Sequence, residues 1–148
     1  MWLKHAQVYD IHQNKFNFTD IKVENNIIST LGDCPASASE TINLKGAFLL
    51  PGFIDCHVHI CLNTRDPNPN NPQRDLLPGT IALWAAEAAK RMLHCGITSA
   101  REVGGWDYHE IAVREAIEDG LISGSRLFCA GRILTQTSSS TPFYKGMY

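Results

Sequence analysis

Short apolar segments alternate with segments of helical periodicity in the part of the chain that follows Pro51-Gly52. The predicted strands are residues 53–59, 97–103 and 126–130, and the predicted helices are residues 80–95 and 107–120. Such alternation is typical of βαβ units, in which the strands are parallel and the crossovers are right-handed. The pattern therefore predicts an α/β fold in which parallel strands are joined by helices.

Local signals mark the ends of both predicted helices. Gly96 follows an apolar helical stripe and is expected to end the first helix as a C′ glycine. Asp107 is followed three residues later by Glu110, a spacing typical of a capping box, and Gly120 is expected to end the second helix. Between the first strand and the first helix, residues 60–77 are predicted to form a long polar loop.

Residues 1–51 contain short apolar segments that are separated by turn residues. Asn25-Asn26 lies between two of them and favours a tight hairpin, because asparagine tolerates positive φ. The segment therefore predicts a small β region that needs a partner to pack against. We expect two domains, a small β region over 1–51 and an α/β region over 52–148.

The length and composition of the chain limit what these two regions can be. A complete (β/α)₈ barrel takes about 250 residues and at least about 200, whereas this chain has 148. Its composition, with 44% hydrophobic residues and a net charge of −2, favours a packed core and no nucleic-acid partner. The sequence contains no apolar run long enough to span a membrane.

Five cysteines are spread along the chain, and none forms a C-x-x-C pair. An odd number of isolated cysteines is typical of buried thiols in a reducing compartment. The first residues lack an apolar segment followed by a small-residue cleavage site. A cytoplasmic location is therefore expected.

His57 and His59 stand two residues apart in the first predicted strand of the α/β region. Because side chains alternate along a strand, both imidazoles and Asp55 are expected on one face. Neutral imidazoles suit zinc, iron or nickel, and two of them on one face can share a metal ion. On spacing alone, a pair of hydrogen-bonded histidines in a half-buried strand is equally consistent with the sequence.

The sequence around these histidines, L-P-G-F-I-D-C-H-V-H over residues 50–59, resembles the P-G-F/L-I-D-x-H-x-H signature of the metal-dependent amidohydrolase superfamily. Residues 96–105 resemble the second barrel strand of its imidazolonepropionase and Xaa-Pro dipeptidase-like branch, and residues 125–137 resemble the third. Residues 1–51 resemble part of its β-sandwich domain. The resemblance covers most of this chain but only the first part of a family member.

The resemblance implies a partial (β/α) TIM-type barrel after a β-sandwich-like region. It also implies a divalent metal site, with one or two ions and zinc as the expected metal, that activates water to hydrolyse a C–N bond of a small-molecule substrate. His57 and His59 match the first two metal ligands of the family, and Asp55 matches an acidic position that supports a ligand. Arg101 and Glu102 could face substrate, although an ion pair at the barrel rim is the favoured interpretation.

The remaining ligands of the family come from later strands and are not assigned in this chain. His94 and His109 are interpreted as surface or capping residues. Where branch members continue with a T-G-G-H type segment, residues 137–141 read T-S-S-S-T, so no active-site histidine is expected there.

Two interpretations of the molecule remain open. The first is the N-terminal portion of a metal-dependent amidohydrolase that acts on amide, cyclic amide or dipeptide C–N bonds. Such a portion is expected to be inactive alone, because two histidines do not hold a catalytic metal tightly. The alternative is a non-catalytic binding module or a split-enzyme half, which self-associates or binds the missing C-terminal half through an open sheet edge.

Overall fold

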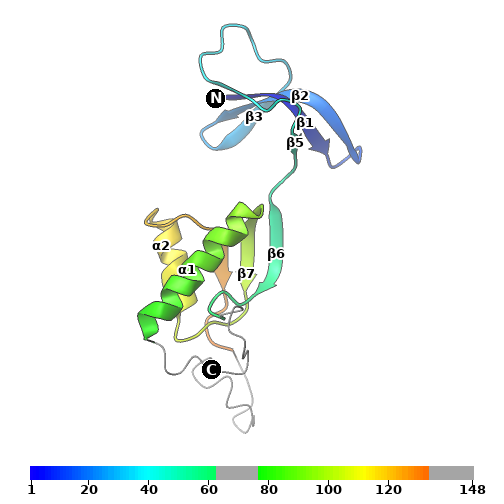
Figure 1. Ribbon diagram of the computed structural model, residues 1–148. Coiled ribbons are helices and arrows are strands. Elements are labelled where there is room, and N and C mark those ends of the chain that lie inside the picture. Colours follow the sequence, from blue (N-terminus) through cyan, green and yellow to red (C-terminus); the bar gives the residue numbers. More distant parts are fainter. Residues whose placement is uncertain (63–76, 134–148) are drawn as a thin grey trace. The chain divides into compact units, whose positions relative to one another are not determined.

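The computed structural model describes residues 1–62 and 77–133. The chain falls into two compact units, Met1–Pro51 and Gly52–Tyr148, and each is described separately below (Figure 1). Most of the predicted loop over 60–77 and all of segment 137–141 lie outside the described residues.

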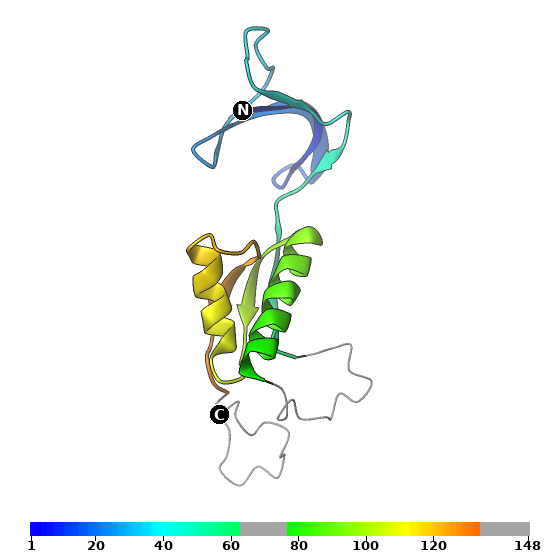
Figure 2. The same cartoon turned by 60° about the vertical axis from the view of Figure 1, so that its left-hand side comes forward.

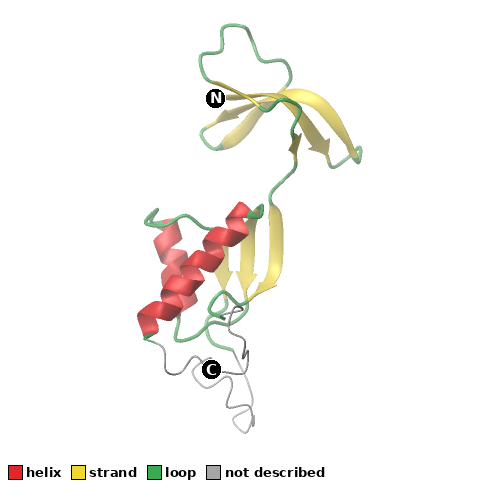
Figure 3. Ribbon diagram, in the orientation of Figure 1, coloured by secondary structure: helices red, strands yellow, loops and turns green. Residues whose placement is uncertain are grey.

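The first unit is a five-stranded sheet in the order β3-β2-β1-β4, with β5 also paired to β1 (Figure 3). Its strands are β1 (Trp2–Asp10), β2 (Lys15–Glu24), β3 (Ile27–Leu31), β4 (Thr41–Asn43) and β5 (Phe48–Leu49). The pairs β1–β2 and β2–β3 are antiparallel, whereas β4 and β5 run parallel to β1. Trp2, Ala6 and Ile21 are its buried apolar side chains among the described residues.

The hairpin predicted at Asn25-Asn26 is present between β2 and β3. Both asparagines have positive φ, 49° and 62°, as a two-residue turn of the type I′ class requires. The short apolar segments of this region understate the length of its first strand, because β1 extends over the whole of Trp2–Asp10. Pairing to β2, β4 and β5 imposes the extended conformation on the polar residues of this segment.

The second unit is a mixed α/β unit with a three-stranded sheet and two helices (Figure 1). Its elements are β6 (Phe53–Val58), α1 (Pro78–His94), β7 (Ile97–Glu102), α2 (His109–Glu118) and β8 (Arg126–Cys129). The sheet order is β6-β7-β8, and both neighbouring pairs are parallel. The prediction of three parallel strands joined by two helices is therefore confirmed.

Both helices lie on the same side of this sheet, as Figures 1 and 2 show. The core between helices and sheet contains small and branched side chains of α1, such as Ile81, Ala85 and Ala89. They pack with Ala100 of β7 and Leu127 of β8. The apolar stripe predicted for the first helix is therefore the face that the helix buries.

The helix ends agree only partly with the sequence signals. Gly96 follows α1 with a φ of +86°, as expected for a C′ glycine. The capping box predicted for α2 is wrong, because its N-cap is Tyr108 and no side chain caps the helix. Asp107 is instead paired with Arg132 at 3.3 Å, and Glu110 is buried.

Residues at the start of the predicted polar loop belong to the core. Ile60 and Cys61 are buried directly after β6. All five cysteines lie in the described residues and none is in a disulfide, but Cys56 and Cys95 are exposed rather than buried. In the described part of the chain, no helix has the length and apolar character that crossing a membrane requires.

Candidate metal site

His57 and His59 lie next to each other at the carboxyl end of β6. Their ring centroids are 5.4 Å apart and the ring planes meet at 77°. His57 is exposed, whereas the side chain of His59 keeps 28% of its surface exposed. The structure therefore brings together the two imidazoles that the sequence singles out, at the end of a parallel strand.

The hydrogen bond of His59 fixes which of its ring nitrogens carries the proton. Nδ1 of His59 lies 2.9 Å from the carbonyl oxygen of Gly104. Because a carbonyl oxygen only accepts, Nδ1 is the donor, and the lone pair of the neutral ring is on Nε2. This is the arrangement in which a histidine ligates a metal through Nε2, so His59 fits that role.

Asp55 contacts the backbone of His57 rather than its ring. Oδ1 of Asp55 accepts a hydrogen bond from the His57 N–H at 3.0 Å. The register of β6 on β7 shifts between Asp55 and Val58. This shift is an irregularity in the pairing of the two strands directly before the end of β6.

Arg101 and Glu102 occupy different environments at the end of β7. Nε of Arg101, which is exposed, donates to the carbonyl oxygen of Cys56 at 2.7 Å. Glu102 is fully buried, and its Oε1 lies 3.7 Å from Nδ1 of His59. Neighbouring strand residues point to opposite faces, and among the described residues no ion pair joins these two side chains.

The carboxyl groups of Glu102 and Glu110 are both buried, and that of Glu102 lies beside His59. Burial raises the pKa of Glu102 to about 7, and burial also raises the pKa of Glu110. The Cys61 thiol donates to Oε2 of Glu110 at 3.9 Å, and burial, together with the nearby carboxylates, raises the pKa of this thiol to about 12. Within residues 1–62 and 77–133, Oε1 of each glutamate is buried without a hydrogen-bond partner.

Sequence reasoning missed the burial of these groups, although two signals point to it. Glu102 follows the core residue Ala100 by two positions in the same strand, and alternation sends both side chains to one face. Glu110 precedes Val113 by three positions in α2, a spacing that places them on one helix face. Both positions belong to apolar faces.

The described residues supply two imidazoles and no further ligand cluster. Nowhere in residues 1–62 and 77–133 do three or more histidine, cysteine, aspartate or glutamate side chains form a group that could hold a metal. His94 is exposed in the last turn of α1, and His109 is the first residue of α2. The donor set therefore fits part of a metal site.

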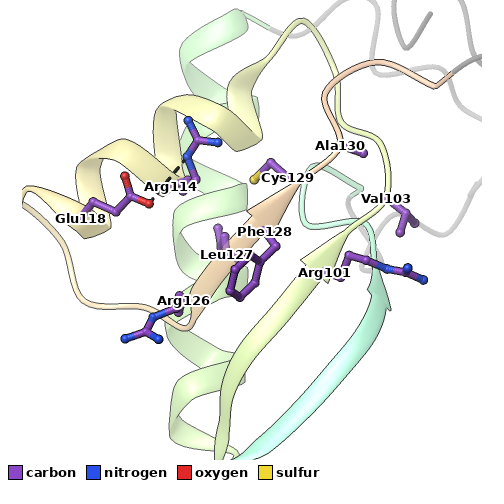
Figure 4. A pocket seen from close by; sticks show the side chains of 9 residues that line it. All are labelled: Arg101, Val103, Arg114, Glu118, Arg126, Leu127, Phe128, Cys129 and Ala130. Carbon is purple, nitrogen blue, oxygen red and sulfur yellow. Dashed lines mark ion pairs between the residues drawn. The ribbon is translucent and has the colours of Figure 1, made fainter.

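An open hollow of about 710 Å³ lies beside β8, away from the histidine pair. Figure 4 shows Arg114 and Glu118 of α2 turned toward each other on one side of it, and Arg101 directed away from α2. The lining residues are Arg101, Val103, Arg114, Glu118, Arg126, Leu127, Phe128, Cys129 and Ala130. Neither His57 nor His59 lines this hollow.

Residues 48–145 match a family model described as the amidohydrolase family. Over 85 residues the chain is 33% identical to a dihydroorotase of Trichlorobacter lovleyi, covering 56% of this chain and 19% of that protein. Over 79 residues it is 34% identical to an adenine deaminase of Listeria monocytogenes, covering 53% of this chain and 13% of that protein.

Solved structures are similar over nearly the whole chain. A Xaa-Pro dipeptidase with bound methionine in its active site aligns with a TM-score of 0.80 and 25% identity, over 95% of this chain and 35% of that one. A structure described as an amidohydrolase aligns with a TM-score of 0.76 and 30% identity, over 92% of this chain and 32% of that one. The chain thus spans about a third of these structures, and less than a fifth of the two relatives above.

Proposed function

Because the chain belongs to the amidohydrolase family, we propose that it is the N-terminal portion of a metal-dependent hydrolase that acts on C–N bonds of a small-molecule substrate. The names of the similar proteins, a dihydroorotase, an adenine deaminase and a Xaa-Pro dipeptidase, support hydrolysis at such bonds. The observation that carries the proposal is the pairing of His57 with His59, whose Nε2 lone pair is available to a metal.

In this proposal the three parallel strands β6, β7 and β8 begin a (β/α) TIM-type barrel over residues 52–148. Residues 1–51 contribute their sheet to a composite β-sandwich. Active sites of such barrels form at the carboxyl ends of the strands. The location of both histidines at the end of β6 agrees with this rule.

His57 and His59 would be two ligands of a divalent metal, with zinc the expected ion. Bound there, the metal would activate a water molecule and polarise the bond to be hydrolysed. Asp55 would hold the backbone of His57 through its hydrogen bond to the N–H. Gly104 would hold His59 in the tautomer that leaves Nε2 unprotonated.

The chain alone is expected to be catalytically inactive. Catalytic zinc sites use three protein ligands and keep one position open, and the proposal assigns two. A general base beside the activated water is also needed, and Asp55 is engaged with the His57 backbone instead.

A second candidate is a binding role, as a split-enzyme half or a module that associates with another chain. It is favoured by the edge of β8, which within the described residues pairs only with β7. Exposed strand edges bind further strands. Phe128 on β8 is 59% exposed and Ile54 on β6 is 71% exposed, so the sheet also offers apolar surface to a partner.

We also propose that the protein is cytoplasmic. The five cysteines form no disulfide, and Cys56 and Cys95 are exposed thiols. Such thiols persist in a reducing compartment. A disulfide detected between any two of them in protein purified without reductant from its native cells would contradict this location.

Zinc titration in competition with a chromophoric chelator tests the metal site. We expect weak binding that falls at least about tenfold in His57→Ala and in His59→Ala, with no change in the control His94→Ala. Binding that is the same in all four proteins would overturn the site.

Hydrolase assays with added zinc test the inactivity of the chain. N-acyl amino acids and Xaa-Pro dipeptides offer the C–N bonds of the proposal, and lactones offer a related C–O bond. No turnover of any of them is expected. Metal-dependent turnover that His57→Ala abolishes would overturn the inactive-portion proposal and establish a complete site instead.

A further inference from the structure

We propose that Glu102 is a positioning residue for His59: its buried carboxyl group accepts the N–H of Gly104 and faces Nδ1 of the imidazole, and so directs Nε2 of His59 toward a metal. This inference rests on the proposed function, because it assigns His59 to a metal site. The sequence suggested that Glu102 could face substrate. In this proposal Glu102 instead orients His59 from the side of the ring that is away from the metal.

Two hydrogen bonds connect the three residues through one glycine. Oε2 of Glu102 accepts the N–H of Gly104 at 2.9 Å, and the carbonyl oxygen of Gly104 accepts Nδ1–H of His59 at 2.9 Å. Glu102 and His59 therefore bond to the two sides of Gly104. The carbonyl that accepts from His59 belongs to the following peptide unit, whose own N–H, that of Gly105, donates to the carbonyl oxygen of Gly131 at 3.2 Å. Gly104 has a φ of +146°, and a Cβ there would lie 2.1 Å from Cγ1 of Ile133, so the glycine cannot be replaced without strain.

The second carboxylate oxygen of Glu102 faces the same ring nitrogen directly. Oε1 lies 3.7 Å from Nδ1 of His59 and accepts no hydrogen bond of normal geometry from the described residues, although the backbone N–H of Ile60 is close enough to lower the pKa of this carboxyl group. A fully buried, unpaired carboxylate oxygen is costly to a folded protein. An imidazole that binds a cation through one nitrogen becomes more positive at the other N–H, so metal binding at Nε2 would offset this cost.

Glu102 and Asp55 differ in what they can do for the site. Asp55 bonds the backbone of His57 and belongs to the ligand's own strand. Glu102 comes from the adjacent strand β7 and contacts the His59 ring. A carboxylate behind a ligating histidine orients the ring and increases its basicity, and among these two only Glu102 is in that position.

Glu110 provides a matched control for Glu102. It is equally buried, and its Oε1 is likewise unpaired within the described residues. Its carboxyl group contacts the Cys61 thiol instead of His59. A glutamine at either position removes one buried carboxyl group, but only Glu102→Gln removes the one that faces the ligand.

The first test reads the His59 tautomer in the metal-free chain by ¹⁵N NMR of the histidine side chains. In the wild-type protein we expect Nδ1 to be protonated. In Glu102→Gln the side-chain amide can still accept from Gly104, but it places an N–H donor opposite Nδ1–H, so the Nδ1–H population should fall. Wild-type His59 protonated at Nε2 would overturn the proposal, and this measurement needs no variant to fold.

The second test compares zinc affinity among variants. Glu102→Gln should lose 10- to 100-fold, and Glu110→Gln less than about threefold. Glu102→Asp keeps the carboxyl group but has a shorter side chain. If Glu102 acts through its charge, Glu102→Asp should lose less zinc affinity than Glu102→Gln. If Glu102 only fills space, Glu102→Asp should lose more. An equal loss of zinc affinity in Glu102→Gln and Glu110→Gln would also overturn the proposal.

If wild-type protein binds no zinc at the histidines, the proposed function fails, and the tautomer measurement still decides the role of Glu102.

Discussion

The carboxyl group of Glu110 occupies the space where a side chain at position 105 would lie, and Gly105 has none. A Cβ atom added at position 105 would lie 1.8 Å from Oε2 of Glu110, closer than atoms can approach. The buried glutamate of α2 and the glycine after β7 are therefore matched in shape. This relationship makes their substitutions interdependent.

Gly105→Ala is expected to destabilise the protein by about 1–3 kcal/mol, as overpacking of an interior does. In the background of Glu110→Ala the clashing carboxyl group is gone, so adding Gly105→Ala should cost much less. Urea unfolding of the two single variants and the double variant measures this coupling. Effects that add to within about 0.5 kcal/mol would contradict the close contact.

The effect of Glu110→Gln on the free energy of unfolding is expected to depend on pH. Relative to wild type, the variant should be more stable at pH 8 than at pH 4.5. Burial raises the pKa of Glu110 above its ordinary value of 4.5, so the folded protein binds the proton more tightly than the unfolded chain. The stability from this group is then fully present below pH 4.5 and is lost as the pH rises through the folded value. Glutamine does not ionise and avoids this loss.

Urea unfolding at the two pH values measures the difference between wild type and variant. The charge of Glu110 also contributes to the raised pKa values of Glu102 and the Cys61 thiol. Glu110→Gln removes this repulsion, which stabilises the variant at pH 8 in the same direction. Glu115→Gln on the same helix is the control, because its side chain is 63% exposed. A Glu110→Gln effect that is equal at both pH values would contradict the burial of an ionisable carboxyl group.

Alkylation of the native protein should distinguish the cysteines by position. Cys56 and Cys95 are exposed and should react with iodoacetamide at pH 8. Cys61 is buried and the pKa of its thiol is raised to about 12, so it should react only after unfolding. Peptide mass spectrometry reads each site separately. Rapid modification of Cys61 under native conditions would show that this part of the core is open.

Removal of bound zinc with EDTA is expected to leave the fold unchanged. His57 and His59 lie at the end of β6, while the core packs Ala85, Ala100 and Leu127 without any contribution from a metal. Circular dichroism and the urea midpoint before and after dialysis measure this. Stoichiometric zinc that survives dialysis against EDTA would mean that further ligands complete the site.

Features that depend on neighbouring residues in the sequence were predicted correctly. The Asn25-Asn26 hairpin and the Gly96 helix end follow from the backbone conformations that these residue types tolerate. The parallel order of β6, β7 and β8 follows from the alternation of strands and helices. These signals are local, so a single sequence contains them.

Features that depend on tertiary contacts were predicted incompletely. Asp107 has the sequence context of a capping residue but is paired with Arg132, which is distant in sequence. The irregular pairing of β6 with β7 between Asp55 and Val58 was not predicted. Glu102 was considered as a substrate-facing residue or as part of an ion pair at the barrel rim. It is buried instead, because β7 continues the core face defined by Ala100 to its last residue.

The parallel pairing of the second unit also implies an order of assembly. The contact between Arg101 and Cys56, which joins β7 to β6, spans 45 residues of sequence, whereas the bond between Ser125 and Ile97, at the start of β8 and β7, spans 28. Closing the longer loop costs about 0.4 kcal/mol more chain entropy, and folds rich in distant contacts form more slowly than folds rich in local ones. We therefore expect β7, α2 and β8 to form a folding nucleus onto which β6 docks later. The two imidazoles at the end of β6 would then acquire their neighbours in a late step of folding.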